Sequence, residues 1–371
     1  MQFTTQVQPL LDSLSVVTRA LASRPARPIL DGVLIDAAGD AVTLTCSDGS
    51  MTIEASVAAD ITKEGQIVVP GRLLNDLIRR LPGGDVTFRL VGDNRLQVTC
   101  LSSRSSLTAQ NAAEYPEVPQ MGSLMKVEVA EAELRQMISG VVFSIATDES
   151  RQLLTGCLME VLPSELRMVA LDGFRLAMQI RKNENTLPAG KEKYRVVIPG
   201  RVMNELARVL PDNKDDKCVL IFDSSRVRVE FGEVRFSSVL LQGEYIDYDR
   251  IIPKNFATEM LISRTEFLDA IDRASLMARE GRNNLVKLHV DTESLSIVSN
   301  ADMGEVHEEM TCAMNGNPID IAFNAKYLSD AIRNIDQDEI RFCFNSNVSP
   351  SVIRPKEGEK YLYLVLPVRT F

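Results

Sequence analysis

Several residue types that build catalytic and metal sites are scarce in this sequence. The chain of 371 residues has no tryptophan and only two histidines, His289 and His307. Its six cysteines are scattered, and none forms a CxxC pair or another spacing typical of zinc ligands or of a disulfide framework. A histidine-based triad or metal centre is therefore poorly supported, and we expect neither a metal nor a cofactor. Such cysteine usage indicates a reducing compartment, the cytoplasm.

Targeting segments, membrane spans and common enzyme signatures are also missing. No apolar run approaches the ~20 residues that a membrane helix needs, and Met1–Gln6 has no basic region followed by an apolar one. The patterns GxxxxGK[ST], GxGxxG, GxSxG and HExxH do not occur. The acidic run Asp212–Lys217 does not fit an EF-hand and is better interpreted as a solvated turn. We expect no membrane contact and no catalytic chemistry of these classes.

Positive charge is in deficit, because 41 lysines and arginines face 51 aspartates and glutamates, which gives a net charge of −10. An acidic chain repels polyphosphate, so it could bind nucleic acid only if its cations were gathered on one surface. The remaining composition, 45% hydrophobic and 25% charged, is typical of a globular protein. The length predicts two to three domains.

One strand–helix segment is present three times, at Ile67–Leu81, Val196–Leu210 and Ile321–Ile335. Each copy begins with a short apolar strand and continues as an amphipathic helix. The copies lie about 125 to 130 residues apart, so the chain is one domain repeated three times. We predict an α+β fold with three tandem domains, each with two helices packed on antiparallel sheets. The expected ranges are 1–122, 127–252 and 257–371.

The helix in each copy separates an apolar face from a face with two cations. In the first copy Leu74, Leu77, Ile78 and Leu81 form the apolar face. The cations, two turns apart, are Arg72 and Arg79, Arg201 and Arg208, and Lys326 and Arg333. They could gather positive charge for a ligand, or they could simply be solvated surface. Duplicated domains inherit features, so three pairs are not independent observations and both interpretations stay open.

Other elements repeat at similar intervals. A helix is predicted near the start of each repeat, at Val7–Leu21, Ala130–Phe143 and Thr265–Ala278. Hairpins are predicted to turn at Asp172–Gly173 and at Asn300–Gly304. Three such units in a line would leave strand edges at both ends, which are unstable unless paired with another copy. Two arcs that close edge to edge would form a ring.

In this order and spacing, the motifs resemble the bacterial DNA polymerase III β sliding clamp family. The likeness rests on the triple repeat, the turn Asp172–Leu176, the segment Tyr245–Pro253 and the terminus Leu366–Arg369, and it covers the whole chain. It implies three DNA-clamp domains per chain and a ring-forming, head-to-tail homodimer around duplex DNA. The implied function is a non-catalytic processivity factor. The implied partners are the DNA polymerase III alpha subunit, the clamp loader, and other polymerases and repair proteins, which bind through short apolar peptides.

The resemblance also implies roles for particular residues. Arg24 matches a DNA-contacting arginine, and the basic pairs would face phosphates. Ser105 and Leu107 match one side of the dimer interface, and Leu276 and Met277 match the other. The peptide pocket is matched by Leu154, Leu171, Gly173, Phe174, Arg175, Leu176, Ile246, Arg250, Ile251, Tyr327, Val348, Pro350, Leu364, Leu366, Pro367, Val368 and Arg369.

Several of the pocket residues differ from those of the best-known family members. Phe174 replaces a histidine and Leu366 replaces a methionine, and the other changes also keep or raise apolar character. We therefore expect a persistent pocket with an altered peptide preference. The alternative to a DNA-encircling clamp is a repeat scaffold that binds proteins only, with its basic faces solvated.

Overall fold

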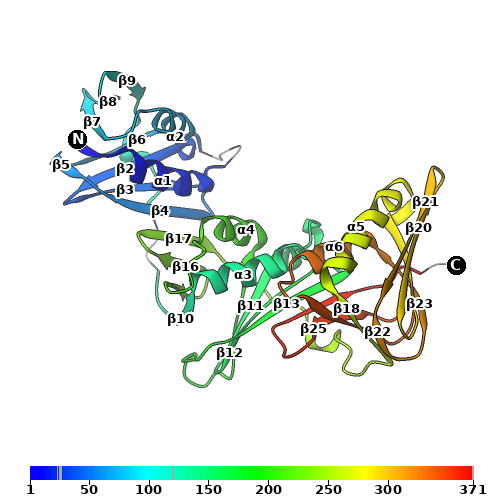
Figure 1. Cartoon of the computed structure of the whole chain (residues 1–371). Helices are drawn as coiled ribbons and strands as arrows, with labels where there is room; N and C mark the ends of the chain where they lie inside the picture. The colour runs from blue at the N-terminus through cyan, green and yellow to red at the C-terminus, as the bar shows by residue number, and fades with distance from the viewer. Residues whose placement is uncertain (23, 25–26, 119–120, 370–371) are drawn as a thin grey trace. The chain divides into compact units, whose positions relative to one another are not determined.

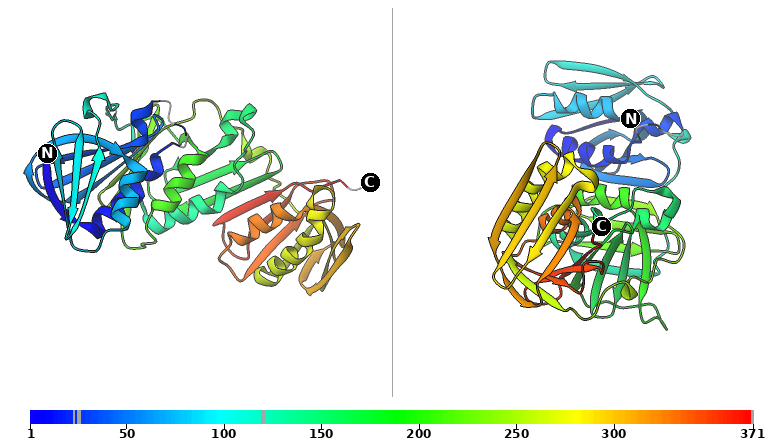
Figure 2. Two further views of the ribbon diagram at one scale, coloured as in Figure 1. Left: turned by 90° about the horizontal axis from the view of Figure 1, so that it is seen from above. Right: turned by 90° about the vertical axis from the view of Figure 1, so that its right-hand side faces the viewer.

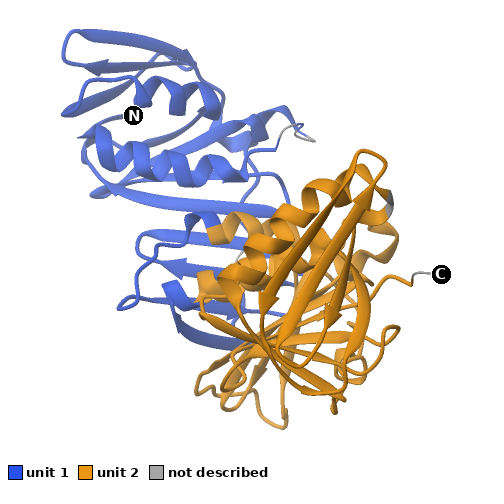
Figure 3. Ribbon diagram, turned by 45° about the vertical axis from the view of Figure 1, so that its right-hand side comes forward, with its two compact units in different colours: residues 1–133, 208–240 blue, residues 134–207, 241–371 orange. Residues whose placement is uncertain are grey.

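The chain folds into two compact units (Figure 3). Unit 1 comprises Met1–Glu133 and Arg208–Leu240, and unit 2 comprises Leu134–Ala207 and Leu241–Phe371. The computed structural model (Figure 1) describes every residue except 23, 25, 26, 119, 120, 370 and 371, and every side chain among the rest except that of Arg282. The second sequence repeat is therefore divided, because its parts belong to different units.

The described part of unit 1 contains two sheets whose neighbouring strands are antiparallel. The first has the order β5 (Asp60–Lys63), β1 (Gln2–Gln6), β7 (Asp85–Val91), β8 (Arg95–Cys100) and β9 (Ser103–Thr108). The second has the order β10 (Met125–Ala130), β15 (Lys217–Phe222), β16 (Arg226–Phe231), β17 (Val234–Val239), β4 (Met51–Ala58), β3 (Ala41–Ser47), β2 (Gly32–Ala38) and β6 (Gly65–Pro70). The pairing of β17 with β4 joins strands of the first and second repeats into one sheet.

Unit 2, as far as residue 369, also contains two sheets. The larger has the order β14 (Tyr194–Pro199), β11 (Gly156–Leu162), β12 (Glu165–Leu171), β13 (Arg175–Lys182), β26 (Tyr361–Val365), β25 (Ser351–Pro355), β24 (Glu339–Phe344), β18 (Thr258–Ser263) and β22 (Ala313–Gly316). The smaller has the order β21 (Gly304–Thr311), β20 (Ser294–Ala301), β19 (Leu285–Val290) and β23 (Ile319–Asn324). Here β13 pairs with β26, so the second and third repeats share a sheet.

Within the described residues, six α-helices accompany these sheets: α1 (Val7–Val17), α2 (Gly71–Arg79), α3 (Glu131–Val142), α4 (Gly200–Val209), α5 (Arg264–Glu280) and α6 (Ala325–Arg333). In unit 1, α1 packs against α2 and against β3 and β4. In unit 2, α5 and α6 lie side by side, with α5 on the smaller sheet and α6 next to β23 and β26 (Figure 2). The 3₁₀ turns are Thr18–Ala20, Pro28–Asp31, Ala112–Glu114, Glu149–Thr155, Tyr248–Arg250 and Arg282–Asn284.

The predicted helices and turns are confirmed, with small shifts at their ends. The helix expected at Val7–Leu21 stops at Val17 and continues as the 3₁₀ turn Thr18–Ala20. The hairpin at Asp172–Gly173 joins β12 to β13, and Gly173 has a φ of +94°, which a residue with a side chain rarely adopts. The hairpin at Asn300–Gly304 joins β20 to β21.

The strand–helix junction is tight in all three copies, because each helix begins at the residue directly after its strand. A Cβ on Gly71 would lie 2.8 Å from Leu21 Cδ1, and one on Gly200 would lie 2.7 Å from the Thr155 carbonyl oxygen. Gly200 is therefore needed for close approach to the backbone, whereas at Gly71 the flexible end of the Leu21 side chain could shift. The third copy has Ala325 instead, and the Asn324 side chain caps this helix by accepting a hydrogen bond of 3.0 Å from the Lys326 amide.

Candidate functional site

Helix α2 presents its two outer cations to solvent. Leu74 and Ile78 are buried, whereas Arg72 and Arg79 are exposed, so the predicted separation of faces is confirmed. Arg72 Nη2 donates a hydrogen bond of 3.0 Å to the Ala22 carbonyl oxygen. That contact uses a neutral acceptor and leaves the positive charge of the guanidinium uncompensated.

Helix α4 repeats the arrangement. Met203 and Leu206 are buried, and Arg201 and Arg208 are exposed. Asn204, which lies on the same polar face, donates a hydrogen bond of 2.9 Å from its Nδ2 to the Gly200 carbonyl oxygen. The second copy therefore also shows the predicted separation of faces.

Helix α6 shows the same phase but a different charge environment. Leu328, Ala331 and Ile332 are buried, as predicted. Lys326 Nζ lies 2.8 Å from Asp330 Oδ2. Arg333 Nη2 lies 2.8 Å from Asp272 Oδ2 of α5. Each cation of this pair is thus neutralised locally by a carboxylate.

Arg24 is exposed in the segment between the turns Thr18–Ala20 and Pro28–Asp31. Some of its neighbours lie outside the described residues. Its exposure permits contact with a ligand, and its role stays a prediction.

Five of the residues expected in the peptide pocket belong to one apolar cluster of unit 2. Leu154, Leu171, Leu176 and Leu364 are buried in it, and Leu366 packs against it. They come from the turn Glu149–Thr155, from β12 and β13, and from β26 with the segment that follows it. The pairing of Leu176 with Leu364 between β13 and β26 brings distant parts of the sequence together.

Aromatic side chains lie at the rim of this cluster. Phe174 is 58% exposed, and its ring stacks on that of Tyr327 with a centroid distance of 6.1 Å. The Leu366 amide donates a hydrogen bond of 2.9 Å to the Phe174 carbonyl oxygen, which fixes the C-terminal segment to the hairpin turn. Partial burial, and next the charge of Asp172, raise the pKa of Tyr327, so its hydroxyl stays protonated at neutral pH.

Arg175 holds the rim together. Its Nε lies 3.0 Å from Asp172 Oδ2 and its Nη1 lies 2.7 Å from Asp330 Oδ2, while Nη2 donates to the Phe143 carbonyl oxygen. Its guanidinium carbon also lies 4.6 Å from the centre of the Tyr327 ring. Because only 9% of this side chain is exposed, Arg175 acts as a brace between the turn and α6 more than as a contact surface.

The remaining expected pocket residues lie nearer the surface. Ile246, Ile251 and Val348 are exposed, and Pro350, Pro367 and Val368 are half-buried. Arg250 is exposed and its Nε lies 2.8 Å from Asp247 Oδ2. Arg369 is exposed near the chain end. Ile246 and Ile251 are neighbours in sequence of Tyr245 and Ile252, which belong to the apolar cluster or pack against it.

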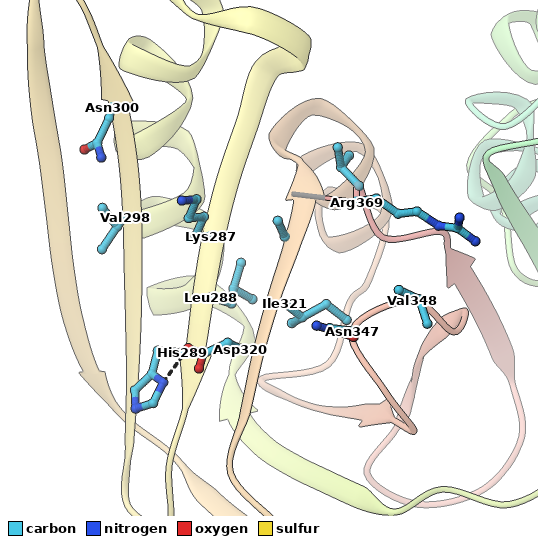
Figure 4. A pocket seen from close by; sticks show the side chains of 12 residues that line it. Lys287, Leu288, His289, Val298, Asn300, Asp320, Ile321, Asn347, Val348 and Arg369 are labelled. Carbon is cyan, nitrogen blue, oxygen red and sulfur yellow. Dashed lines mark hydrogen bonds and ion pairs between the residues drawn. The ribbon is translucent and has the colours of Figure 1, made fainter. Parts of the chain in front are cut away.

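A cavity of about 620 Å³ lies beside these residues (Figure 4). It is lined by β19, β20 and β23 on one side and by Asn347, Val348, Val368 and Arg369 on the other. Three of its lining residues, Val348, Val368 and Arg369, also belong to the expected peptide pocket. The cavity therefore adjoins that pocket, although the sequence did not indicate it.

The expected interface residues differ in how available their side chains are. Leu276 is 58% exposed and Met277 is half-buried, both on α5. Ser105 is half-buried and Leu107 is buried within unit 1, both on β9, which is an edge strand. The backbone edge of β9 is thus more available to a partner than the Leu107 side chain.

Sequence reasoning missed the acidic residues that organise this region, Asp172, Asp272 and Asp330. The spacing of Lys326 and Asp330 at i and i+4 is a signal for an ion pair on a helix. No local pattern relates Asp272 to Arg333, because these residues come from different helices. Among the described residues, no helix is long and apolar enough to cross a membrane, and no group of three metal-ligating side chains comes together.

Comparisons with known proteins agree over the whole chain. Models of the DNA polymerase III beta subunit match residues 1–119 (N-terminal domain), 128–247 (central domain) and 249–369 (C-terminal domain). The chain is 33% identical to the beta sliding clamp of Staphylococcus aureus (strain Mu50 / ATCC 700699), with full coverage of both chains. The crystal structure of the DNA polymerase sliding clamp from Bacillus subtilis is 34% identical, with a TM-score of 0.95 and full coverage of both chains. A Pseudomonas aeruginosa sliding clamp solved with griselimycin is 28% identical, with a TM-score of 0.94 and full coverage of both chains.

Proposed function

Because this chain belongs to the family of DNA polymerase III beta subunits, the beta sliding clamps, we propose that it encircles duplex DNA and tethers the replicative polymerase to its template. The observation that carries this proposal is that three clamp-domain models match the chain in order along its length. A protein of this kind confers processivity and has no catalytic chemistry of its own. It acts in the cytoplasm, where its template lies.

The outer faces of α2, α4 and α6 are the surfaces that we assign to DNA. Arg72, Arg79, Arg201 and Arg208 are exposed opposite buried apolar faces, and Arg24, Lys326 and Arg333 complete the set. Contact with phosphates gives affinity without sequence preference, as a sliding protein requires. Gathering cations on these helices also explains how a chain with a net charge of −10 can bind DNA.

The test uses a nicked circular duplex loaded with the protein by a clamp loader. A closed ring stays on the circle and slides off when the circle is linearised, whereas a protein bound to one side of DNA is unaffected by linearisation. Reversal of Arg72, Arg79, Arg201 and Arg208 to glutamate should abolish retention while the circular dichroism spectrum is unchanged. Absence of retention even on the intact circle would favour the scaffold that binds proteins only, and retention that persists after linearisation would show binding to one side of the DNA.

Ring closure requires two copies joined head to tail. Each sheet at an end of the chain has an unpaired edge, β9 in unit 1 and β21 in unit 2, and pairing between copies would remove both edges. Leu276 and Met277 lie on α5, which packs on β21. Changing both to glutamate should give a monomer, because the interface would bury unpaired charge. Sedimentation of the wild-type protein as a 41.1 kDa monomer at micromolar concentration would exclude the ring.

The apolar cluster around Leu176, Leu364 and Leu366 is the surface that we assign to partner peptides. Burying one large apolar side chain contributes roughly 1.5–3 kcal/mol. Two or three such anchors, reduced by the ordering of a flexible peptide, give a dissociation constant on the order of micromolar. Such weakness lets the polymerase alpha subunit, the clamp loader, other polymerases and repair proteins exchange on one clamp.

A fluorescent peptide with the apolar anchor of the polymerase alpha subunit, called here the anchor peptide, tests this assignment. Removal of the residues from Pro367 onward should weaken its binding at least tenfold, because one wall is lost, while dimerisation and DNA retention stay near normal. Equal affinity for the truncated and full chains would refute the pocket.

A further inference from the structure

The cavity beside the expected pocket is built on the face of the smaller sheet that is turned away from α5. Lys287 and His289 of β19, Val298 of β20 and Asp320 of β23 line it. Alternation along β19 places Lys287 and His289 on this exposed face, while Leu288 between them is buried. The cavity is therefore an open, mixed polar and apolar trough and not part of the hydrophobic core.

Positive charges outnumber negative charges among the side chains that line the cavity. His289 Nδ1 lies 2.7 Å from Asp320 Oδ1 (Figure 4), which fixes the position of this carboxylate, the one acid among the lining residues that the structure describes. Among the described residues, neither Lys287 nor Arg369 has a carboxylate within ion-pair distance. In Figure 4, Lys287 lies on the sheet side, and Arg369 extends from the C-terminal segment toward the side of Val348. The described part of the lining thus holds two cations against one carboxylate, a net positive charge in a chain that is acidic overall.

The backbone of β23 offers a second kind of contact. This strand is the edge of its sheet, and the Ala322 carbonyl oxygen accepts a hydrogen bond of 2.7 Å from the Val368 amide. In an antiparallel strand the N–H and C=O of one residue point the same way and alternate residues share that direction. Because the Ala322 carbonyl points outward, the N–H and C=O of Asp320 do so as well. An extended peptide can add to this edge next to the segment that ends at Arg369.

From these contacts we infer that the cavity binds an acidic extended segment that continues from the apolar anchor of a partner peptide. The inference rests on the proposed function, since the anchor must occupy the adjoining pocket. The segment pairs with the β23 edge at Asp320 and places carboxylates at Lys287 and Arg369. A volume of about 620 Å³ is within the range of about 300–1,000 Å³ typical of ligand pockets.

A peptide fits the cavity better than a nucleic acid does. The described lining includes Val298, Ile321, Val348 and Val368 and no Phe, Tyr or Trp ring on which a base could stack, and its one imidazole, His289, contacts Asp320. An open strand edge also recognises a polypeptide backbone and not a sugar–phosphate chain. The occupant is therefore an acidic peptide, and a single-stranded oligonucleotide is the rival that the experiment must exclude.

The experiment extends the anchor peptide at either end with Glu-Glu-Glu, Lys-Lys-Lys or Gly-Ser-Gly and measures its affinity by fluorescence anisotropy. With the wild-type protein, the glutamate extension at one end should bind about threefold to tenfold more tightly than Gly-Ser-Gly, as expected for one or two charge-assisted contacts. The readout is the ratio between the glutamate-extended and lysine-extended affinities. This ratio is the association constant of the glutamate-extended peptide divided by that of the lysine-extended peptide. It should fall below one in Lys287→Glu, because the lysine extension then binds more tightly. It should be unchanged in the control Lys182→Glu, which alters an exposed lysine at the end of β13.

Other outcomes would overturn one assignment or both. If the unextended anchor peptide does not bind, the pocket assignment and this inference both fail. If it binds but the extensions have equal affinities, or if Lys287→Glu leaves the ratio unchanged, the inference alone is wrong. If a twelve-residue oligothymidylate displaces the glutamate-extended peptide from the wild-type protein but not from Lys287→Glu, the site binds nucleic acid instead.

Discussion

Helices α2 and α6 occupy the same position in the first and third repeats, yet their cations have different surroundings. Arg72 and Asp76 on α2 have the same i, i+4 spacing as Lys326 and Asp330 on α6. Only the second pair forms a salt bridge, because Arg72 instead donates to the Ala22 carbonyl oxygen. A pattern of charges therefore predicts where cations lie but not whether they remain available to a ligand.

The neighbours of each helix explain the difference. In unit 2, α5 runs beside α6 and supplies Asp272 to Arg333, and β13 supplies Arg175 to Asp330. These carboxylates compete with phosphates for the same cations. The helix α2 has no such pair among the described residues, so its arginines should carry more of the affinity for DNA.

The largest expected effect is on the salt dependence of duplex binding, and it should appear when the cations of α2 or of α6 are replaced by alanine. Arg72→Ala with Arg79→Ala should lower the slope of log affinity against log salt by about 1.8, since each lost phosphate contact removes about 0.9. Lys326→Ala with Arg333→Ala should lower it by less than about 0.9, because those cations already have partners. Binding of a fluorescent duplex over a salt series measures both slopes, with Arg89→Ala, an exposed arginine on β7, as the control. Equal changes for the two helices would contradict the comparison.

A smaller effect, on affinity for the anchor peptide, is expected from replacing Asp330. This carboxylate accepts hydrogen bonds from both Lys326 and Arg175. Asp330→Ala leaves the nearly buried Arg175 guanidinium with one carboxylate fewer. Loss of a hydrogen-bond partner by a buried group lowers the free energy of unfolding by about 1–3 kcal/mol. The rim formed by Phe174 and Tyr327 should loosen, and affinity for the anchor peptide should fall about tenfold. The matched control is Glu280→Ala at the exposed end of α5. An unchanged affinity would show that Arg175 does not hold the rim through Asp330.

Removing the charge of Asp272, the partner of Arg333, should make this cation of α6 as available to DNA as those of α2. Asp272→Asn releases Arg333, so the salt slope for duplex binding should rise by up to about 0.9. Asp76→Asn on α2 removes the same charge without releasing an ion-paired cation, so its slope should change less. The duplex titration used for the deletions also measures these two variants. If both raise the slope equally, only net charge matters and local pairing does not.

The smallest expected effect is on the free energy of unfolding and concerns an ion pair between α5 and β21. Arg273 Nη2 of α5 lies 2.7 Å from Glu308 Oε2 of β21. The hydrogen bond from Arg273 lowers the pKa of Glu308, so its stabilising contribution is present above the ordinary value of 4.5 and is lost as the pH falls below it. This pair is partly exposed, so Glu308→Gln should cost no more than about 0.5 kcal/mol at pH 7. Urea unfolding of both proteins between pH 7 and pH 3 should show the difference disappearing on acidification. A difference that grows toward low pH would have the wrong sign.

Local patterns in the sequence were enough to predict the repeat, the helices and the faces of the helices. Spacing of apolar residues is a local property, so Leu74 and Ile78, Met203 and Leu206, and Leu328 and Ile332 could all be assigned to the core from that spacing alone. Full-length likeness to sliding clamps also indicated the expected pocket residues. The domain limits 1–122, 127–252 and 257–371 and the roles of those residues stay predictions.

How the repeats are joined, and which charges are compensated, depends on the folded chain. Pairing of β17 with β4 and of β13 with β26 merges neighbouring repeats into shared sheets, so three repeats form two compact units. The same pairing brings Leu176 to Leu364, and helix packing brings Asp272 to Arg333. None of these contacts could be derived from local patterns, because strand order and ion pairing depend on residues that are distant in sequence and become neighbours only on folding.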